Sequence, residues 1–316
     1  MKKTKNIIYL FLLISIFSCG ATKTIPINEN KITTVKVNSN KPYQKQGLRK
    51  IVIDAGHGGS DYGASGKYSH EKNVSLSVAL LLEAEIKKQI PDVEVYMTRT
   101  TDIYDHVHIK ADKANASKAD LFISIHCNSS AGTIHRVFKG YKTIKVKKGR
   151  KKVSKKVAQY DYYTTPSTAK GTETFIWGIN KNEDKFNALK ENNSSYGDSA
   201  MLMDQNSLDD PEQIAAISLR MQQYTERSRN LAYAVQNEFT KIGRENRDAK
   251  QRAKGIWVLQ AVAMPAILVE LGFISNPEEE DYINSEQGQK ELSESIARAV
   301  KQYKQNIENK MNYNNR

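Results

Sequence analysis

Cysteine is nearly absent from this chain of 316 residues, and so are long apolar runs. Only Cys19 and Cys127 are present, so at most one disulfide can form, and none can form if Cys19 is modified. The fold must then be held by a hydrophobic core, which a chain of this length can supply. The apolar stretch near the start, Ile7–Phe17, is too short to remain as a membrane-spanning helix.

Acidic residues are scarce in two parts of the chain, and the basic charge is concentrated there. The formal net charge is +13, of which residues 1–50 contribute +9. The stretch Lys139–Lys156 contains no acid and contributes +10, so the remaining residues carry −6. A dedicated nucleic-acid-binding protein is expected to have a surface that is basic throughout, and this distribution of charge excludes such a surface.

The first residues have the features of an export signal. Lysines precede the apolar run Ile7–Phe17, and small residues end it. Ile16–Cys19 resembles a bacterial lipobox, in which Cys19 becomes the lipidated first residue, and ordinary cleavage near Ala21 is the alternative. We therefore expect residues 1–19 to be a signal peptide of the lipoprotein type. The mature protein would be exported to the periplasm and anchored to a membrane through Cys19.

Composition divides the rest of the chain. Residues 20–47 are polar and aperiodic, which predicts a flexible linker, and residues 306–316 predict a disordered tail. Between them, at 48–305, strands alternate with amphipathic helices. This pattern predicts a single α/β domain, with a twisted, mixed but mostly parallel sheet and helices on both faces. Two insertions are expected, a basic loop or hairpin at about 132–165 and a polar segment at about 178–222.

The stretch Ile51–Gly59 joins a buried strand to a glycine-flanked histidine, His57. In open α/β sheets, ligands and metals lie at the carboxyl ends of strands, which is where His57 falls. The glycines permit a sharp turn and leave space around the imidazole. Alone the stretch gives weak support for a site, since many glycine-rich turns carry a histidine that has no chemical role.

Two glutamates stand at positions where a carboxylate needs an explanation. Glu71 precedes a helix predicted by the apolar stripe from Val74 to Ile86, and the helix dipole alone would favour a carboxylate there. Glu270 lies in the apolar strand Pro265–Phe273, where a carboxylate costs free energy unless it is paired, bound to metal or at an edge. A structural role at the helix start and a structural ion pair are the respective alternatives to a functional site.

The strand Phe122–Asn128 carries a second candidate histidine. Side chains alternate along a strand, so His126 and Cys127 point to opposite faces and cannot form a nucleophile pair. Cys127 is then a small core residue, whereas His126 is a polar side chain at the carboxyl end of an apolar strand. His106 and His108 have no such context, and we expect them at the surface.

Four polar side chains thus stand near strand or helix ends: His57, Glu71, His126 and Glu270. Two imidazoles and one carboxylate are typical of a catalytic zinc site that leaves one position open for water. Zinc lowers the pKa of such a water to about 7 and polarises a carbonyl. A further carboxylate can take the water's proton and pass it to a leaving nitrogen. The residue types therefore indicate amide hydrolysis, although the spacing alone does not prove it.

Six stretches resemble, in the same order, those of the zinc-dependent N-acetylmuramoyl-L-alanine amidases, and the resemblance extends from about Leu48 to Lys304. The stretches are Asp54–Gly59, Glu71–Asn73, Thr98–Arg99, Ser124–Asn128, Gly171–Thr174 and Val269–Asn276. The resemblance implies that His57, Glu71 and His126 bind Zn²⁺. It implies Glu270 as the catalytic carboxylate. It further implies cleavage of the amide between N-acetylmuramic acid and L-alanine in peptidoglycan, for wall remodelling or daughter-cell separation.

The resemblance also bears on the insertion at 178–222. Some cell-separation amidases of this family carry a helix at the equivalent place that covers the zinc. We hypothesise a regulatory helical insertion of this kind, displaced by a protein activator, and a passive loop is the alternative. Departures from the family are modest: Cys127 stands where alanine is frequent, and Lys110 stands where arginine is common.

Other classes of function compete with an amidase. A catalytically silent peptidoglycan-binding or activator protein on the same fold is disfavoured, since all four chemical residues are present. A zinc peptidase that cuts within the stem peptide would use the same site. The stretch Lys139–Lys156 is compatible with a solvated surface or with a polyanion contact, and the export signal disfavours nucleic acid as that polyanion.

Overall fold

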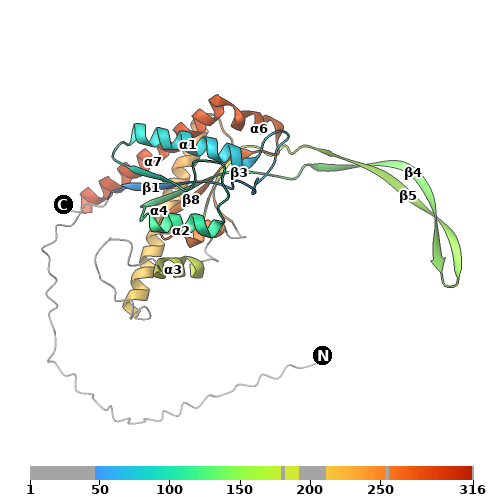
Figure 1. Cartoon of the computed structure of the whole chain (residues 1–316), viewed down its shortest axis with the longest axis horizontal. Coiled ribbons are helices and arrows are strands. Elements are labelled where there is room, and N and C mark those ends of the chain that lie inside the picture. The colour runs from blue at the N-terminus through green and yellow to red at the C-terminus, as the bar shows by residue number, and fades with distance from the viewer. Residues whose placement is uncertain (1–46, 179–181, 192–210, 253–255, 315–316) are drawn as a thin grey trace, which may run out of the picture. The chain divides into compact units, whose positions relative to one another are not determined.

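The computed structural model describes residues 47–178, 182–191, 211–252 and 256–314, with a six-stranded sheet at the centre (Figure 1). The strand order is β2-β1-β3-β8-β6-β7, and all neighbours are parallel except β6 and β8. The predicted mixed, mostly parallel sheet is confirmed. The strand bounds are β1 Lys50–Ala55, β2 Glu94–Met97, β3 Leu121–Asn128, β6 Thr172–Ile176, β7 Asn246–Gln251 and β8 Ala266–Phe273.

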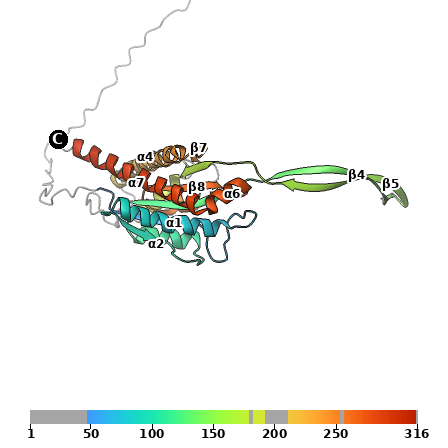
Figure 2. The same cartoon turned by 90° about the horizontal axis from the view of Figure 1, so that it is seen from above.

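Helices cover both faces of this sheet, as predicted (Figure 1), and Figure 2 looks down on the face covered by α1 and α7. One face packs on α1, α4 and α7, and the other packs on α2 and α5. None of the described helices is both long and apolar enough to cross a membrane. The helix bounds are α1 Glu71–Gln89, α2 Val107–Ala116, α3 Asn182–Glu191, α4 Pro211–Lys241, α5 Trp257–Ala261, α6 Pro277–Asn284 and α7 Glu286–Asn314.

The central strands are apolar along their length because both of their faces are buried. In β1, Ile51 and Ile53 lie in the core formed with α1 and α7, whereas Val52 lies in the core formed with α2 and α5. In β3, Ile123 and Phe122 divide between the two cores in the same way. Burial of each such side chain contributes about 1.5–3 kcal/mol, which makes these strands the stable frame of the domain.

Two elements have no clear signal in the sequence. β7 has the charged sequence Asn246–Gln251 and forms the outer edge of the sheet, where its side chains stay exposed or half-buried. α3 lies in a polar segment and is held by the fully buried Lys185, which donates to the carbonyls of Leu259 (3.1 Å), Val262 and Met264 (3.0 Å). These carbonyls lie in or just after α5, so a buried lysine holds α3 in place together with the apolar contacts of Ala188 and Leu189.

Two other segments are more regular than their sequences suggest. The pattern from Asp210 to Gly243 allows one helix or two, and the structure has one continuous helix, α4. α7 continues to Asn314, through most of the residues 306–316 that were expected to form a disordered tail. The expected signal peptide at 1–19 and all but the last residue of the expected linker at 20–47 lie outside the described residues.

The basic insertion is a long antiparallel hairpin, which agrees with the expected loop or hairpin. β4 (Thr133–Lys148) pairs with β5 (Lys151–Thr165) in a sheet of its own (Figure 1). Gly149 stands at the turn with φ +63°, a left-handed conformation that glycine adopts without steric cost. We refer to residues 133–165 below as the basic hairpin.

Candidate metal centre

The strand order reverses at β1, which makes this a topological switch point of the sheet. β1 lies between β2 and β3, so the chain leaves β1 toward one side and later returns on the other. Ligands of open α/β sheets bind at the carboxyl ends of the strands where this reversal occurs. His57 follows β1 directly, and His126 lies near the carboxyl end of β3. The topology therefore brings together two histidines that are distant in the sequence.

Two buried cations hold the carboxyl end of β1 in place. Arg99 donates to the carbonyls of Ala55 (3.0 Å) and Gly56 (2.7 Å). Lys110 donates to the same Ala55 carbonyl (2.6 Å) and pairs with Asp54 at 3.0 Å. Lys110, which stands where arginine is common in the sequences that the chain resembles, thus takes part in this buried network. These contacts fix the backbone from which His57 projects.

His57 is held in an unusual conformation with both ring nitrogens engaged. Its φ is +57°, in the left-handed region that is uncommon for non-glycine residues. Nδ1 lies 2.8 Å from Oδ2 of Asp61, and Nε2 lies 3.1 Å from Oε2 of Glu71. Burial by itself would lower the pKa of His57, but the hydrogen bonds and charges of Glu71 and Asp61 raise this pKa to about 9.

Glu71 is the first residue of α1 and is almost fully buried. Its Oε2 accepts a hydrogen bond from the Ala64 amide (2.7 Å), and its Oε1 accepts one from the Cys127 amide (3.0 Å). Oε1 also lies 2.8 Å from Nδ1 of His126. Burial would raise the pKa of Glu71, but the contacts with His126 and His57 hold it well below its usual range. Glu71 is thus an anionic link between the two histidines.

The three side chains form one compact cluster. The candidate donor atoms of His57, Glu71 and His126 all lie within 4.8 Å of one another. The two imidazole rings meet edge to face, with centroids 5.0 Å apart and an interplanar angle of 74°. Two imidazole nitrogens and one carboxylate oxygen, held together at a strand edge, fit a divalent metal ion such as Zn²⁺.

Glu270 lies beside this cluster. In the sheet register it is the partner of His126 on β3 and of Glu173 on β6. Its side chain is buried, and its Oε2 has no hydrogen-bond partner. Burial, followed by the charge of Glu71, raises the pKa of Glu270 to about 8. Among the described residues Glu270 forms no ion pair, so the structural ion pair considered above is not present.

Two functional neighbours were missed by the sequence analysis. Asp61 orients His57, and its only sequence signal is its place four residues after that histidine. Glu173 neutralises two cations, Arg247 (2.7 Å) and Lys250 (3.1 Å). Both cations lie on β7, a strand that the sequence did not predict. The stretch Gly171–Thr174 is part of the family resemblance and contains Glu173, but the sequence does not show that Glu173 pairs with Arg247 and Lys250.

Gly56 leaves the space that His126 occupies. A Cβ atom at this position would lie 2.5 Å from Cε1 of His126 and 2.6 Å from its Nε2. We expect Gly56→Ala to displace the imidazole and to weaken Zn²⁺ binding by about 10–100-fold, measured by calorimetric titration. Gly47→Ala is the control, since its Cβ would meet only the flexible carboxylate of Glu308. Unchanged Zn²⁺ affinity in a folded Gly56→Ala variant would contradict this geometry.

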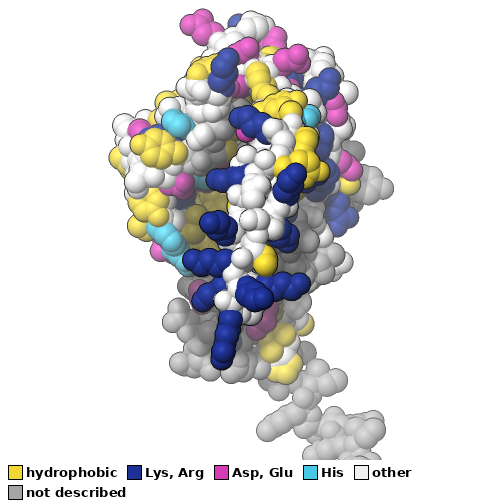
Figure 3. Space-filling view, turned by 90° about the vertical axis from the view of Figure 1, so that its right-hand side faces the viewer, with side chains coloured by type: hydrophobic (Ala, Val, Ile, Leu, Met, Phe, Trp, Pro, Cys, Tyr) yellow, Lys and Arg dark blue, Asp and Glu magenta, His cyan; other side chains and the backbone are white. Residues whose placement is uncertain are grey.

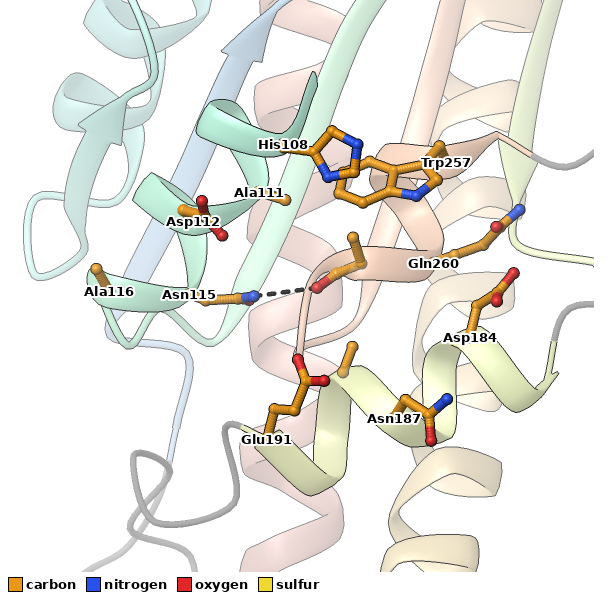
Figure 4. A pocket seen from close by; sticks show the side chains of 12 residues that line it. His108, Ala111, Asp112, Asn115, Ala116, Asp184, Asn187, Glu191, Trp257 and Gln260 are labelled. Carbon is orange, nitrogen blue, oxygen red and sulfur yellow. Dashed lines mark hydrogen bonds between the residues drawn. The ribbon is translucent and has the colours of Figure 1, made fainter. Parts of the chain in front are cut away.

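The two histidines at the start of α2, His106 and His108, do not join the cluster. His106 and His108 are exposed, as expected, and stack on each other, while His108 also contacts the ring of Trp257. His108 and Trp257 border an open hollow of about 560 Å³ between α2, α3 and α5 (Figure 4). One wall is fixed by Asn115, whose amide donates to the carbonyl of Ala261 (3.0 Å). Its lining includes none of the four candidate site residues.

The described part of the segment 178–222 packs away from the cluster. Leu189 of α3 forms a small core with Ile217 of α4 and with Ala263. The remainder of the expected regulatory insertion, residues 179–181 and 192–210, lies outside the described residues.

Comparisons with known proteins agree with this architecture. The sequence profile of the N-acetylmuramoyl-L-alanine amidase family matches residues 51–302. N-acetylmuramoyl-L-alanine amidase AmiC of Escherichia coli O6:H1 is 31% identical over 257 residues, which cover 80% of this chain and 52% of that protein. The AmiC protein of Neisseria meningitidis serogroup B is 30% identical over 261 residues, with the same coverage. The chain thus spans about half the length of these curated relatives.

A solved structure shares the fold. The crystal structure of N-acetylmuramoyl-L-alanine amidase from Clostridium difficile 630 superposes with a TM-score of 0.52 at 26% sequence identity. The match covers 82% of this chain and 97% of that one.

Proposed function

This chain belongs to the N-acetylmuramoyl-L-alanine amidase family, and from that premise we propose that it is a Zn²⁺-dependent peptidoglycan amidase. The substrate bond would be the amide between N-acetylmuramic acid and the L-alanine of the stem peptide. The observation that carries the proposal is the convergence of His57, Glu71 and His126 on one point, with the unpaired carboxylate of Glu270 beside them.

In this proposal His57, Glu71 and His126 hold the metal. When bound, Zn²⁺ supplies a Lewis acid that polarises the scissile carbonyl and makes a water molecule more acidic. Asp61 engages Nδ1 of His57, which leaves Nε2 as the nitrogen directed at the cluster. The amides of Ala64 and Cys127 fix both oxygens of Glu71, so the donor set is oriented before the metal binds.

Glu270 is the proposed proton carrier. Its Oε2 is free to accept a proton from the attacking water and to deliver it to the departing nitrogen of L-alanine. The buried site raises the pKa of Glu270, and nearby positive charge favours its ionised form, so its proton affinity suits both directions of transfer. Transfer to nitrogen is needed because an amide anion is a poor leaving group.

The proposal extends to location and partners. Peptidoglycan lies outside the cytoplasm, which agrees with the basic and apolar start of the chain and with the lipobox-like Ile16–Cys19. We propose export to the periplasm and anchoring through Cys19. A protein activator that uncovers the site is proposed on the resemblance to cell-separation amidases, with part of the insertion at about 178–222 as the segment that it would displace.

The test is digestion of purified sacculi by protein that lacks residues 1–19, with and without a chelator. We expect the released material to contain intact stem peptides with a free L-alanine amino group, identified by mass spectrometry. The chelator should abolish this release and added Zn²⁺ should restore it. Fragments cut within the stem peptide would indicate a peptidase. A metal-loaded protein that binds sacculi and releases nothing would indicate a silent binding protein.

A further inference from the structure

The basic hairpin begins at the carboxyl end of β3, where the candidate metal centre also lies. β4 begins shortly after β3 ends at Asn128, two residues beyond His126. β5 returns the chain to β6, the strand that carries Glu173. A strand of 16 residues is about 50 Å long, so the tip can reach far beyond a substrate at the candidate metal centre.

The charge of the basic hairpin is almost entirely of one sign. The stretch Lys139–Lys156 holds ten Lys or Arg residues and no acid. Lys139 pairs with Asp161 at 2.6 Å near the base. The other basic side chains of this stretch, all of which the structure describes, form no ion pair. Dark blue Lys and Arg side chains therefore line both sides of the hairpin (Figure 3).

Strand pairing brings like charges together at the tip. Lys147 is directly opposite Lys152, and Lys148 is directly opposite Lys151. Like charges in such positions destabilise a hairpin, and an isolated two-stranded hairpin is only marginally stable in water. A solvated surface would gain nothing from this arrangement, whereas a bound polyanion would relieve the repulsion.

The distribution of lysines between the two faces indicates the shape of that polyanion. Cross-strand partners share a face, so the register assigns four lysines to each side. One face carries Lys142, Lys148, Lys151 and Lys155, and the other carries Lys145, Lys147, Lys152 and Lys156. A flat lipid surface would meet only one of these faces. A network of anionic strands can surround the arm and meet both.

We propose that the basic hairpin is a docking arm for the peptidoglycan network, binding the carboxylates of uncut stem peptides near the one at the metal centre. This proposal rests on the proposed function, since it takes the anionic polymer to be the substrate matrix. Several weak contacts made at once raise the effective concentration of the enzyme at the wall and keep it there between cleavages. Contacts between exposed charges of this kind weaken as salt rises.

The experiment uses the full mature chain in a Glu270→Gln background, so that binding to insoluble sacculi is measured without turnover. The tip variant replaces four lysines by glutamine: Lys147, Lys148, Lys151 and Lys152. A matched variant removes the same charge from exposed lysines of the domain body: Lys87, Lys88, Lys170 and Lys301. An arginine version of the tip variant restores the charge and checks that any loss is not due to an altered strand.

At low salt we expect the tip variant to bind sacculi about tenfold or more weakly, with a flatter salt dependence, while the body and arginine variants bind as the parent does. Sacculi with amidated carboxyl groups should bind the parent as weakly as native sacculi bind the tip variant. Native binding of the tip variant, or undiminished binding to amidated sacculi, would overturn the proposal. So would a tip variant that loses binding only to phosphatidylglycerol vesicles.

A second assay separates this proposal from the proposed function. With Glu270 restored, the tip variant and the parent should hydrolyse a short soluble muramoyl peptide at rates within about twofold, because such a substrate cannot reach the tip. A parent that fails to cleave this substrate overturns the amidase function. A tip variant that is equally impaired on soluble and insoluble substrates overturns the docking role.

Discussion

Glu270→Gln is expected to lower kcat by about 10²–10⁴-fold while leaving the Zn²⁺ content unchanged. Glutamine keeps the size of the side chain but cannot accept the proton of an attacking water. Glu270 is the in-register neighbour of His126, and its Oε2 has no other partner that would explain its presence in an apolar strand. Removing its charge from this buried position should also leave the protein at least as stable as before.

The measurement is the rate of stem-peptide release by metal-loaded protein, with metal content determined on the same sample. Glu238→Gln is the control for loss of a buried carboxylate, since Glu238 lies on α4 and pairs with Arg298 at 2.8 Å. This control should keep the activity of the parent per folded molecule, because Glu238 lies outside the site. Full activity in Glu270→Gln would refute the proton-transfer role.

His126→Ala is expected to abolish both Zn²⁺ binding at micromolar concentrations and hydrolysis. It removes one of three donor atoms and also one of the two contacts of Oε1 of Glu71, the other being the Cys127 amide. In the parent protein, Zn²⁺ at 100 times its dissociation constant should add about 2.7 kcal/mol to the free energy of unfolding. The variant should gain nothing from the same addition.

Calorimetric titration and thermal unfolding with and without Zn²⁺ test this expectation together. His106→Ala is the matched control, because His106 is an exposed histidine of the same domain that caps α2 and lies outside the cluster. It should bind Zn²⁺ and gain the same stabilisation from added Zn²⁺ as the parent does, whatever the loss of the cap costs in the absence of metal. Stoichiometric Zn²⁺ binding by His126→Ala would show that the metal is held by other residues.

The candidate site residues stand out in the sequence because each has a local cause. His57 and His126 follow or end apolar strands, and Glu270 interrupts one, so the period-two pattern and the carboxyl-end rule mark them as candidates, whose roles come from the family resemblance. Glu71 could be placed at a helix start, but its double role could not be seen. It stands in the first turn of α1, where the helix dipole favours a carboxylate, and it also joins two histidines; the sequence presented these roles as alternatives.

Elements that depend on distant partners were not predictable. β7 has a charged sequence, and it forms a strand because it pairs with β6 at the edge of the sheet. α3 is held largely by Lys185, which donates to three carbonyls in or just after α5, and a lysine gives no sequence signal for a buried position. The direction of β6 against β8, and with it the position of Glu173 beside Glu270, likewise follows from the path of the chain.

The sequence alone thus indicated the apolar strands, the amphipathic helices, the basic hairpin and four candidate side chains, because alternation, burial and turn residues act over a few neighbours. Only the tertiary structure decided that three of those side chains meet within 4.8 Å and that the fourth stands unpaired in the next strand. Distances between residues far apart in the chain are set by strand order, and strand order depends on the packing of the whole sheet.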